Sequence, residues 1–170
     1  MDVICRPMVA GDFDAVCELH VRAWQSAYRG SVPQAFLDGM DPAERARRTR
    51  DRSLADQHVA EAGGEVIGWL SIGPYRFEDD SHSPGPGCGE IAAIYLRPSS
   101  VGTGAGRALL TYGLAELDRA GLRPVLLWVL TGNARARRFY EQAGFRLDGA
   151  THTYEVGGAT LPEVRYRYDG

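Results

Sequence analysis

Apolar and polar positions recur with two periods along the chain, and these periods predict its helices and strands. Apolar side chains three or four residues apart, as in residues 13–27, are typical of a helix with one buried face. Short apolar or alternating runs, as in residues 125–129, are typical of strands. Helices are predicted over 13–27, 41–54, 104–121 and 133–143, with a single turn at 34–40, and strands over 3–8, 58–61, 66–72, 90–96, 125–129, 145–153 and 161–168.

The connections between these elements predict the topology of the sheet. Glycine-containing turns at 62–65 and 156–159 join neighbouring strands as antiparallel hairpins. The strands 90–96 and 125–129 are instead linked through a helix, which requires a parallel, right-handed unit. We therefore expect an α/β (α+β) fold with a mixed, mostly antiparallel sheet of about seven strands and helices on both faces. Residues 77–89, rich in Asp, Ser, Pro and Gly, predict an exposed loop.

Length and composition are those of one ordinary globular domain. The chain has 170 residues, within the usual size of one domain with a substantial core, and we expect a single domain over residues 1–170. Hydrophobic residues make up 44% and charged residues 24%, which excludes a disordered or fibrous chain. The formal net charge of -3 provides no global field for nucleic acid or an anionic membrane, so neither is an expected partner.

The cysteines and the hydropathy pattern indicate a compartment. Cys5, Cys17 and Cys88 are odd in number and form no C-x-x-C pair, which argues against a disulfide framework and against a zinc site. The N-terminus lacks a basic stretch followed by an apolar segment, and no apolar run is long enough to cross a bilayer. We therefore expect a cytoplasmic protein without a bound metal.

A glycine-rich segment between a strand and a helix is the first sign of a binding site. Gly102, Gly104 and Gly106 alternate at the start of the helix, so the backbone can take positive φ and its N–H groups can face outward. The first N–H groups of the helix and the positive end of its dipole point to the same place, which favours phosphate or pyrophosphate. The spacing G-x-G-x-G, without lysine, fits neither the dinucleotide fingerprint nor the P-loop.

A second motif follows the next strand. Residues 133–145 read Asn-Ala-Arg-Ala-Arg-Arg-Phe-Tyr-Glu-Gln-Ala-Gly-Phe, in which Asn133 can N-cap a helix and Gly144 can end it. The segment is similar, at every marked position, to the N-x-x-A-x-x-F-Y-x-x-x-G-F signature of the Gcn5-related N-acetyltransferase (GNAT) family. The glycine segment resembles the acyl-CoA loop of that family, with Val101 in place of the usual Gln or Arg. The chain is identified as a member of this family over nearly its whole length.

The resemblance implies an acyl-CoA N-acyltransferase fold, in which the two parallel strands splay apart and acetyl-CoA binds as acyl donor. The pantetheine arm would pair with the backbone of Ile94, Tyr95 and Leu96 like an added strand. The other residues expected to bind the donor lie in the glycine segment and at the start of the last helix: Gly102, Thr103, Gly104, Ala105, Gly106, Arg107 and Asn133.

Two residues carry the chemistry that the resemblance implies. Tyr140 matches the family's tyrosine, which acts as general acid for the leaving thiolate. Tyr140 can also be interpreted as an aromatic residue packed under the sheet. Phe139 argues against that interpretation, because it already supplies a core anchor. Glu90 is the candidate general base. Its separation in sequence from the glycine loop equals that of the catalytic glutamate in the histone-acetyltransferase branch of the family. Glu90 can also be interpreted as an exposed residue at a strand end. A backbone N–H near Ile94 is expected to stabilise the oxyanion.

Other bases and nucleophiles have less support. The branch that acetylates ribosomal-protein N-termini has its base on the strand after Glu90, where this chain has Trp128, so that route is closed. A covalent route through Cys88 lacks an activating partner nearby. The histidines that remain as alternative bases, although such residues more often lie on the surface or in the core, are His20, His82 and His152.

Acceptor recognition is expected from the first helix with its following loop and from the last hairpin, through Trp24, Tyr28, Arg29 and Tyr154. Aromatic side chains suit a small amine or amino acid, and Arg29 can bind a carboxylate with two hydrogen bonds; Trp24 can equally be a core residue. The expected function is an acetyl-CoA-dependent N-acetyltransferase that acts by direct attack in a ternary complex. One alternative function is acetylation of a protein lysine or N-terminus, and another is a non-catalytic acyl-CoA sensor. The sequence is also compatible with a homodimer.

Overall fold

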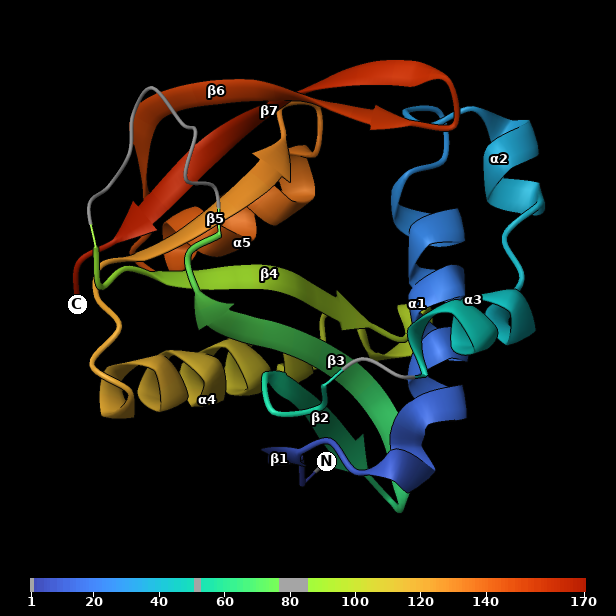
Figure 1. The fold of residues 1–170 in the computed structure, drawn as a ribbon, viewed down its shortest axis with the longest axis horizontal. Helices are drawn as coiled ribbons and strands as arrows, with labels where there is room; N and C mark the ends of the chain where they lie inside the picture. Colours follow the sequence, from blue (N-terminus) through green and yellow to red (C-terminus); the bar gives the residue numbers. More distant parts are fainter. Residues whose placement is uncertain (1, 51–52, 77–85) are drawn as a thin grey trace. The chain divides into compact units, whose positions relative to one another are not determined.

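The computed structural model describes residues 2–50, 53–76 and 86–170. Helices and strands follow one another along the chain in nearly the predicted order (Figure 1). Their bounds are β1 Ile4–Pro7, η1 Ala10–Asp12, α1 Phe13–Ala27, α2 Gln34–Asp38, α3 Pro42–Thr49, β2 Gln57–Ala62, β3 Glu65–Pro74, β4 Gly89–Leu96, η2 Pro98–Ser100, α4 Ala105–Arg119, β5 Val125–Leu130, α5 Ala134–Gln142, β6 Arg146–Val156 and β7 Ala159–Tyr168. Most of the predicted loop at 77–89 lies outside the described residues.

The strands form one sheet in the order β1-β2-β3-β4-β5-β7-β6. β2 runs antiparallel to both β1 and β3, and β7 runs antiparallel to both β5 and β6. β4 and β5, which α4 connects, are parallel. The prediction of a mixed, mostly antiparallel sheet of seven strands with a central parallel pair is therefore confirmed.

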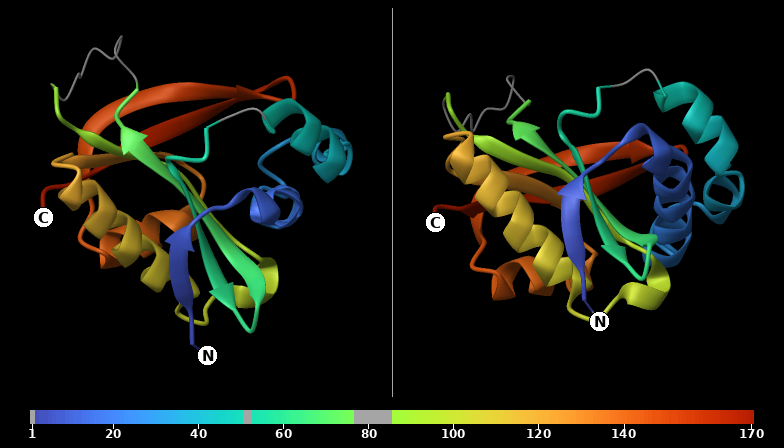
Figure 2. Two further views of the ribbon diagram at one scale, coloured as in Figure 1. Left: turned by 60° about the horizontal axis from the view of Figure 1, so that its bottom comes forward. Right: turned by 90° about the horizontal axis from the view of Figure 1, so that it is seen from below.

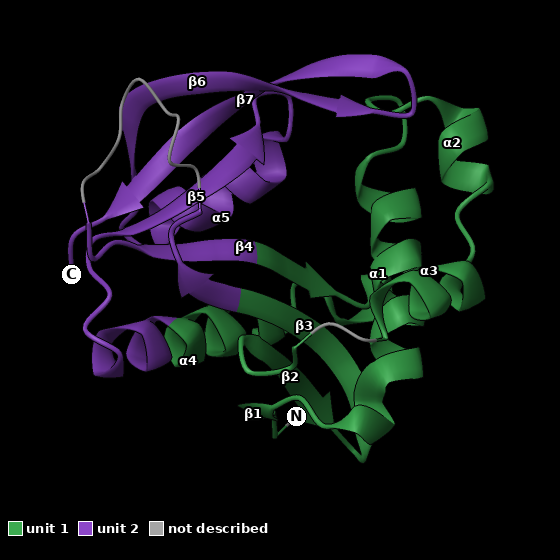
Figure 3. Cartoon of the chain, viewed as in Figure 1, with its two compact units in different colours: residues 1–71, 93–113 green, residues 72–92, 114–170 purple. Residues whose placement is uncertain are grey.

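The chain divides into two compact units (Figure 3). Unit 1 comprises Met1–Ser71 and Ala93–Gly113, and unit 2 comprises Ile72–Ala92 and Leu114–Gly170. The chain passes between the units within β3, β4 and α4. The expectation of a single domain stays a prediction.

Unit 1 has a core beneath α1, whose bounds are those predicted from its apolar period. The buried face of α1 packs with side chains of β2 and β3, and α1 also contacts α3. The views in Figure 2 show β1, β2 and β3 running side by side. The buried members of this core are Met8, Phe13, Val16, Cys17, Leu19, Ala46, Val59, Val66 and Trp69.

An ion-pair network ties β1 to the start of α1. Arg6 donates from Nη1 to Oδ2 of Asp12 at 2.7 Å and from Nη2 to Oδ1 at 2.9 Å, and it also pairs with Glu61. Asp12 is buried and accepts a further bond from the N–H of Val9. The hydrogen bonds from Arg6 hold the pKa of Asp12 below its ordinary value, despite the opposing effect of burial.

Asp12→Asn is therefore expected to lower the free energy of unfolding by about 2 kcal/mol at pH 7, because the hydrogen bonds that half-buried Arg6 donates to this side chain lose their charge assistance. Asp14→Asn, in an exposed pair with Arg50, is the control and should change it by less than about 1 kcal/mol. The Asp12 contribution is present above the ordinary pKa of an aspartate, about 3.9, and is lost as pH falls through the lower folded-state value. Urea titrations at pH 7 and pH 2 check this; an equal difference between variant and wild type at both pH values contradicts it.

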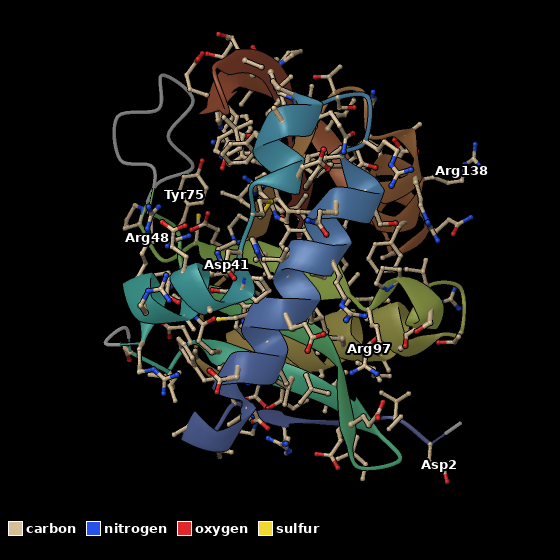
Figure 4. All side chains as sticks on the ribbon, turned by 90° about the vertical axis from the view of Figure 1, so that its right-hand side faces the viewer. Asp2, Asp41, Arg48, Tyr75, Arg97 and Arg138 are labelled. Atoms are coloured by element: carbon tan, nitrogen blue, oxygen red, sulfur yellow. The ribbon has the colours of Figure 1, made fainter. Side chains whose placement is uncertain are left out.

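The helix α3 is shorter than predicted. The Asp41 side chain (Figure 4) caps it by accepting from the N–H of Ala43. Glu44 forms an ion pair with Arg48, and no capping box is present in this described segment. α3 ends at Thr49 rather than near residue 54. Ala46 is its one buried residue, so little apolar burial supports a longer helix, and the Thr49 hydroxyl bonds to the carbonyl of Arg45.

Unit 2 contains β5, β7 and β6 with α5 against one sheet face, together with the end of β3, the start of β4 and the last part of α4. Tyr166 of β7 is fully buried and its ring lies near Tyr140 of α5, and Tyr140 in turn contacts Phe145. The hairpin of β6 and β7 turns at Gly157 and Gly158, whose φ angles of 58° and 81° require glycine or a similarly permissive residue. No helix in the described part of the chain is long and apolar enough to span a bilayer.

Candidate active site

The glycine turn before α4 has the backbone that the sequence predicted at two of its three glycines. Gly102 and Gly104 have φ angles of 85° and 94°, in the left-handed region. A Cβ placed on either residue would find no other atom within 4 Å, so open space surrounds this part of the turn. Gly106 does not have a positive φ, because it already lies in the first turn of α4; the prediction for that glycine is wrong.

The N–H groups of residues 102–107 find no acceptor among the described residues. The first hydrogen bond of α4 runs from the N–H of Ala108 to the carbonyl of Gly104 at 3.1 Å, so the preceding N–H groups have no helical partner. The hydroxyl of Thr103 donates to the carbonyl of Ser100 at 2.8 Å and braces the turn. The Arg107 side chain is exposed beside these donors. The geometry is that of a site for an anion.

The parallel pairing of β4 and β5 is short. Within the described residues of unit 2 its register covers Gly89 with Val125 and Glu90 with Leu126. β4 is buried as far as Ile91 and becomes accessible from Ala92 onward. Ile94, Tyr95 and Leu96 lie in this accessible half, where a central strand is ordinarily covered.

The predicted acceptor residues of unit 1 belong to an aromatic group on α1. The ring centroids of Trp24 and Tyr28 are 4.8 Å apart, and the Tyr28 hydroxyl lies 3.3 Å from that of Tyr95. Trp24 is half-buried and contacts His20, whereas Arg29 is exposed in the following turn. Burial, with a smaller effect of the nearby Arg45 charge, lowers the pKa of His20 to about 3, so His20 is a poor proton acceptor at neutral pH.

Tyr140 is buried in unit 2, and Phe139 is only half-buried. The expectation that Phe139 anchors the core is therefore wrong for this helix. The Tyr140 ring lies 5.7 Å from Phe145 and 6.3 Å from Tyr166, measured between centroids. Asn133 caps α5 as predicted, because its side-chain oxygen accepts from the N–H of Ala136 at 3.1 Å. The cap fixes the start of the helix that carries Tyr140.

Glu90 is buried rather than exposed. Its side chain is 5% accessible, and its Oε2 accepts from Nε of Arg76 at 2.9 Å. The reading of Glu90 as an exposed strand-end residue is therefore wrong. A buried carboxylate needs such a partner, because desolvation of an unpaired charge is costly.

A second polar group of unit 2 lies around Trp128 and was not predicted as a site. The His152 ring is 4.2 Å from that of Trp128 between centroids, and its Nε2 is 3.0 Å from Oε2 of Glu163. Arg165 donates to Asp148 at 2.7 Å and lies over the Trp128 ring at 5.5 Å. Tyr154, the predicted acceptor residue on β6, is exposed.

The cysteines and the other polar residues considered from the sequence form no metal site among the described residues. Cys5, Cys17 and Cys88 form no disulfide, and burial raises the pKa of Cys88. No three His, Cys, Asp or Glu side chains in the described ranges are grouped as metal ligands. His82 lies outside the described residues. Arg138 extends from α5 into solvent (Figure 4).

The fold and the two motifs are those of the N-acetyltransferase class of enzymes. The model of the Acetyltransferase (GNAT) family matches residues 13–145, and the chain belongs to this family. The resemblance carried by the glycine turn and the Asn133-to-Phe145 motif is thereby confirmed.

Curated relatives agree over most of the chain. An uncharacterized N-acetyltransferase, YuaI, of Bacillus subtilis is 30% identical over 90% of this chain and 85% of its own length. A probable N-acetyltransferase, Rv2775, of Mycobacterium tuberculosis is 31% identical over 92% of this chain and 87% of its own. A mycothiol acetyltransferase of a Parafrankia species is 34% identical over 90% of this chain, but over only 52% of its own length.

Solved structures share the fold at low identity. The PaiA N-acetyltransferase of Thermoplasma acidophilum, in complex with coenzyme A, has a TM-score of 0.73 at 17% identity and 100% coverage of both chains. A ribosomal-protein-alanine N-acetyltransferase of Brucella melitensis has a TM-score of 0.73 at 22% identity, covering 98% of this chain and 99% of that one. The predicted acyltransferase fold is confirmed.

Proposed function

We propose that this enzyme transfers the acetyl group of acetyl-CoA to the primary amine of a small molecule or amino acid, by direct attack in a ternary complex. The observation that carries the proposal is the turn at 102–107, with two glycines in the left-handed region, open space around them and N–H groups without acceptors among the described residues. Such donors suit the pyrophosphate of coenzyme A. The neighbour from Thermoplasma acidophilum, solved with coenzyme A, supports the same donor.

The residues that would hold acetyl-CoA follow from this geometry. Gly102, Thr103, Gly104, Ala105 and Gly106 would offer backbone N–H groups to the pyrophosphate, with the charge of Arg107 beside them. The accessible half of β4, at Ile94, Tyr95 and Leu96, would pair with the pantetheine amides. The bound donor supplies an acyl group activated as a thioester.

The chemical steps fall to the chain itself. Tyr140, on the helix capped by Asn133, would donate a proton to the departing sulfur. A backbone N–H near Ile94 would donate to the carbonyl oxygen of the thioester. Glu90 is the base that the family resemblance implies.

The acceptor would be recognised by Trp24, Tyr28, Arg29 and Tyr154. The paired aromatic rings of α1 favour a small apolar or aromatic portion, and the exposed Arg29 favours a carboxylate. A small acceptor also has support from the relative at 34% identity, which is named for mycothiol rather than for a protein.

A thiol-release assay with the full chain and acetyl-CoA tests the proposal. The acceptor panel contains small amines, free amino acids, and peptides with a lysine or a free N-terminus. We expect thiol release with at least one small amine or amino acid. Release with peptides alone would favour a protein acetyltransferase. Tight acetyl-CoA binding by calorimetry without release for any acceptor would favour a sensor module.

A further inference from the structure

A carboxylate outside both motifs lies on the sheet face that carries Trp128. Glu163 of β7 stands opposite Leu130 of β5 on one side and opposite His152 of β6 on the other. Two residues along β7, Arg165 stands opposite Trp128. Side chains of paired residues, and of residues two apart, leave a sheet on the same face, so this group shares one face.

The contacts of His152 fix which of its nitrogens faces Glu163. Nδ1 lies 2.9 Å from the carbonyl oxygen of Thr153, which can only accept, so Nδ1 carries a hydrogen. Nε2, which is buried, lies 3.0 Å from Oε2 of Glu163 in an ion-pair contact. The contact therefore engages the Oε2 side of Glu163.

Glu163 has the surroundings of a proton acceptor. Its side chain is 14% accessible, and its second oxygen, Oε1, has no hydrogen-bond or ion-pair partner among the described residues. Burial raises the pKa of Glu163, and the nearby His152 lowers it in part. The other charged groups that the register places on this face, among the described residues, are Arg165, which Asp148 engages, Arg167, which pairs with Asp169, Arg146 opposite Arg167, and Glu90 of β4. A carboxylate of raised pKa transfers protons near neutral pH more effectively than an ordinary one.

We infer that Glu163, supported by His152, is the general base that removes the proton from the acceptor amine. This inference rests on the proposed function. Oε1 takes one proton from the nitrogen of the neutral amine while that nitrogen bonds to the acyl carbon. The carbon–sulfur bond breaks, its electron pair stays on sulfur, and sulfur takes a proton from Tyr140. Exchange with solvent then removes the proton from Glu163 and returns one to Tyr140.

Glu90 is less suited to this step. Its side chain is 5% accessible, and Arg76 already occupies its Oε2 at 2.9 Å. An amine would have to displace that guanidinium before its proton reached the oxygen. We assign Glu90 the structural task of holding Arg76, which lies two residues beyond the end of β3.

The test is Glu163→Gln in the full chain, assayed with the amine that gives the highest turnover with wild type. The change keeps the size of the side chain but removes its capacity to accept a proton, so kcat/KM should fall by about 100-fold. The affinity for coenzyme A by calorimetry should stay within about twofold. Glu155→Gln, an exposed residue on β6, is the matched control and should keep full activity.

The pH dependence separates a chemical role from a structural one. Wild-type kcat/KM should decline in acid as Glu163 becomes protonated, and this limb should be absent in Glu163→Gln. His152→Gln removes the group that lowers the pKa of Glu163, so the limb should move to higher pH. Wild-type-like turnover of Glu163→Gln, with a loss of 100-fold in Glu90→Gln, overturns the inference. Failure of wild type to release thiol with any amine overturns the proposed function instead.

Discussion

Gly104→Val is expected to weaken coenzyme A binding by at least about 100-fold, close to 3 kcal/mol. Gly104 has a φ of 94°, and its Cβ position opens into the space in front of the α4 donors. Valine would place two methyl groups where a pyrophosphate must approach the N–H groups of residues 105–107. Its branched side chain also disfavours positive φ, so the turn would shift and turn its donors away. Isothermal titration calorimetry with coenzyme A measures the change.

A control must separate backbone strain from the loss of a binding surface. Gly64, in the hairpin turn of β2 and β3, has a φ of 79° and equally open surroundings. Gly64→Val should therefore lower the melting temperature by an amount similar to that for Gly104→Val, because both place valine at positive φ. Its affinity for coenzyme A should not change. Equal affinities for the two variants would remove the turn at 102–107 from the proposed donor site.

The sequence predicted those elements that are marked by a local pattern, such as an apolar period or a pair of glycines. The apolar period over 13–27 gave the bounds of α1 to the residue, and the glycine pairs at 63–64 and 157–158 located both hairpin turns. The end of α3 was not predictable in this way, because no breaker stands at Thr49 and the helix ends where burial against the core ceases. Local capping chemistry marks a helix start more firmly than its end.

Burial at the candidate site depended on packing that no local pattern encodes. Phe139 and Tyr140 are adjacent aromatics on α5, and only the position of Phe145 and Tyr166 decides that Tyr140 is the buried one. The sequence left open whether Glu90 is exposed, because it begins a strand. The pairing of β4 with β5 buries it, and Arg76 pairs with its carboxylate. The glycine turn needed no such context, since its proposed function depends on the backbone.

The Glu163–His152 pair could have been found from the sequence through strand register. In a two-residue hairpin, residues equally far from the turn stand opposite each other. His152 lies four residues before Val156 and Glu163 four residues after Ala159, and Val156 pairs with Ala159. No local motif links His152 to Glu163, which lies eleven residues later. Register, rather than proximity in the chain, brings the two groups together.

Tyr140→Phe is expected to lower kcat by about 100- to 1,000-fold and to leave coenzyme A affinity within about twofold. The substitution removes one hydroxyl and keeps the ring that packs against Phe145 and Tyr166. The departing sulfur then loses its proton donor, while the groups assigned to donor binding are unchanged. Steady-state thiol release gives kcat, and calorimetry gives the affinity.

Tyr166→Phe provides the matched control, because it deletes a hydroxyl from the neighbouring ring on β7. That hydroxyl donates to Oε1 of Glu141 at 2.5 Å and accepts from Nε of Arg137 at 3.1 Å, in a fully buried position. Its loss should lower the free energy of unfolding by about 1–3 kcal/mol and keep kcat within about twofold. If both variants lose the same fraction of turnover, Tyr140 contributes to packing and not to proton transfer, and the thiolate takes its proton from another source.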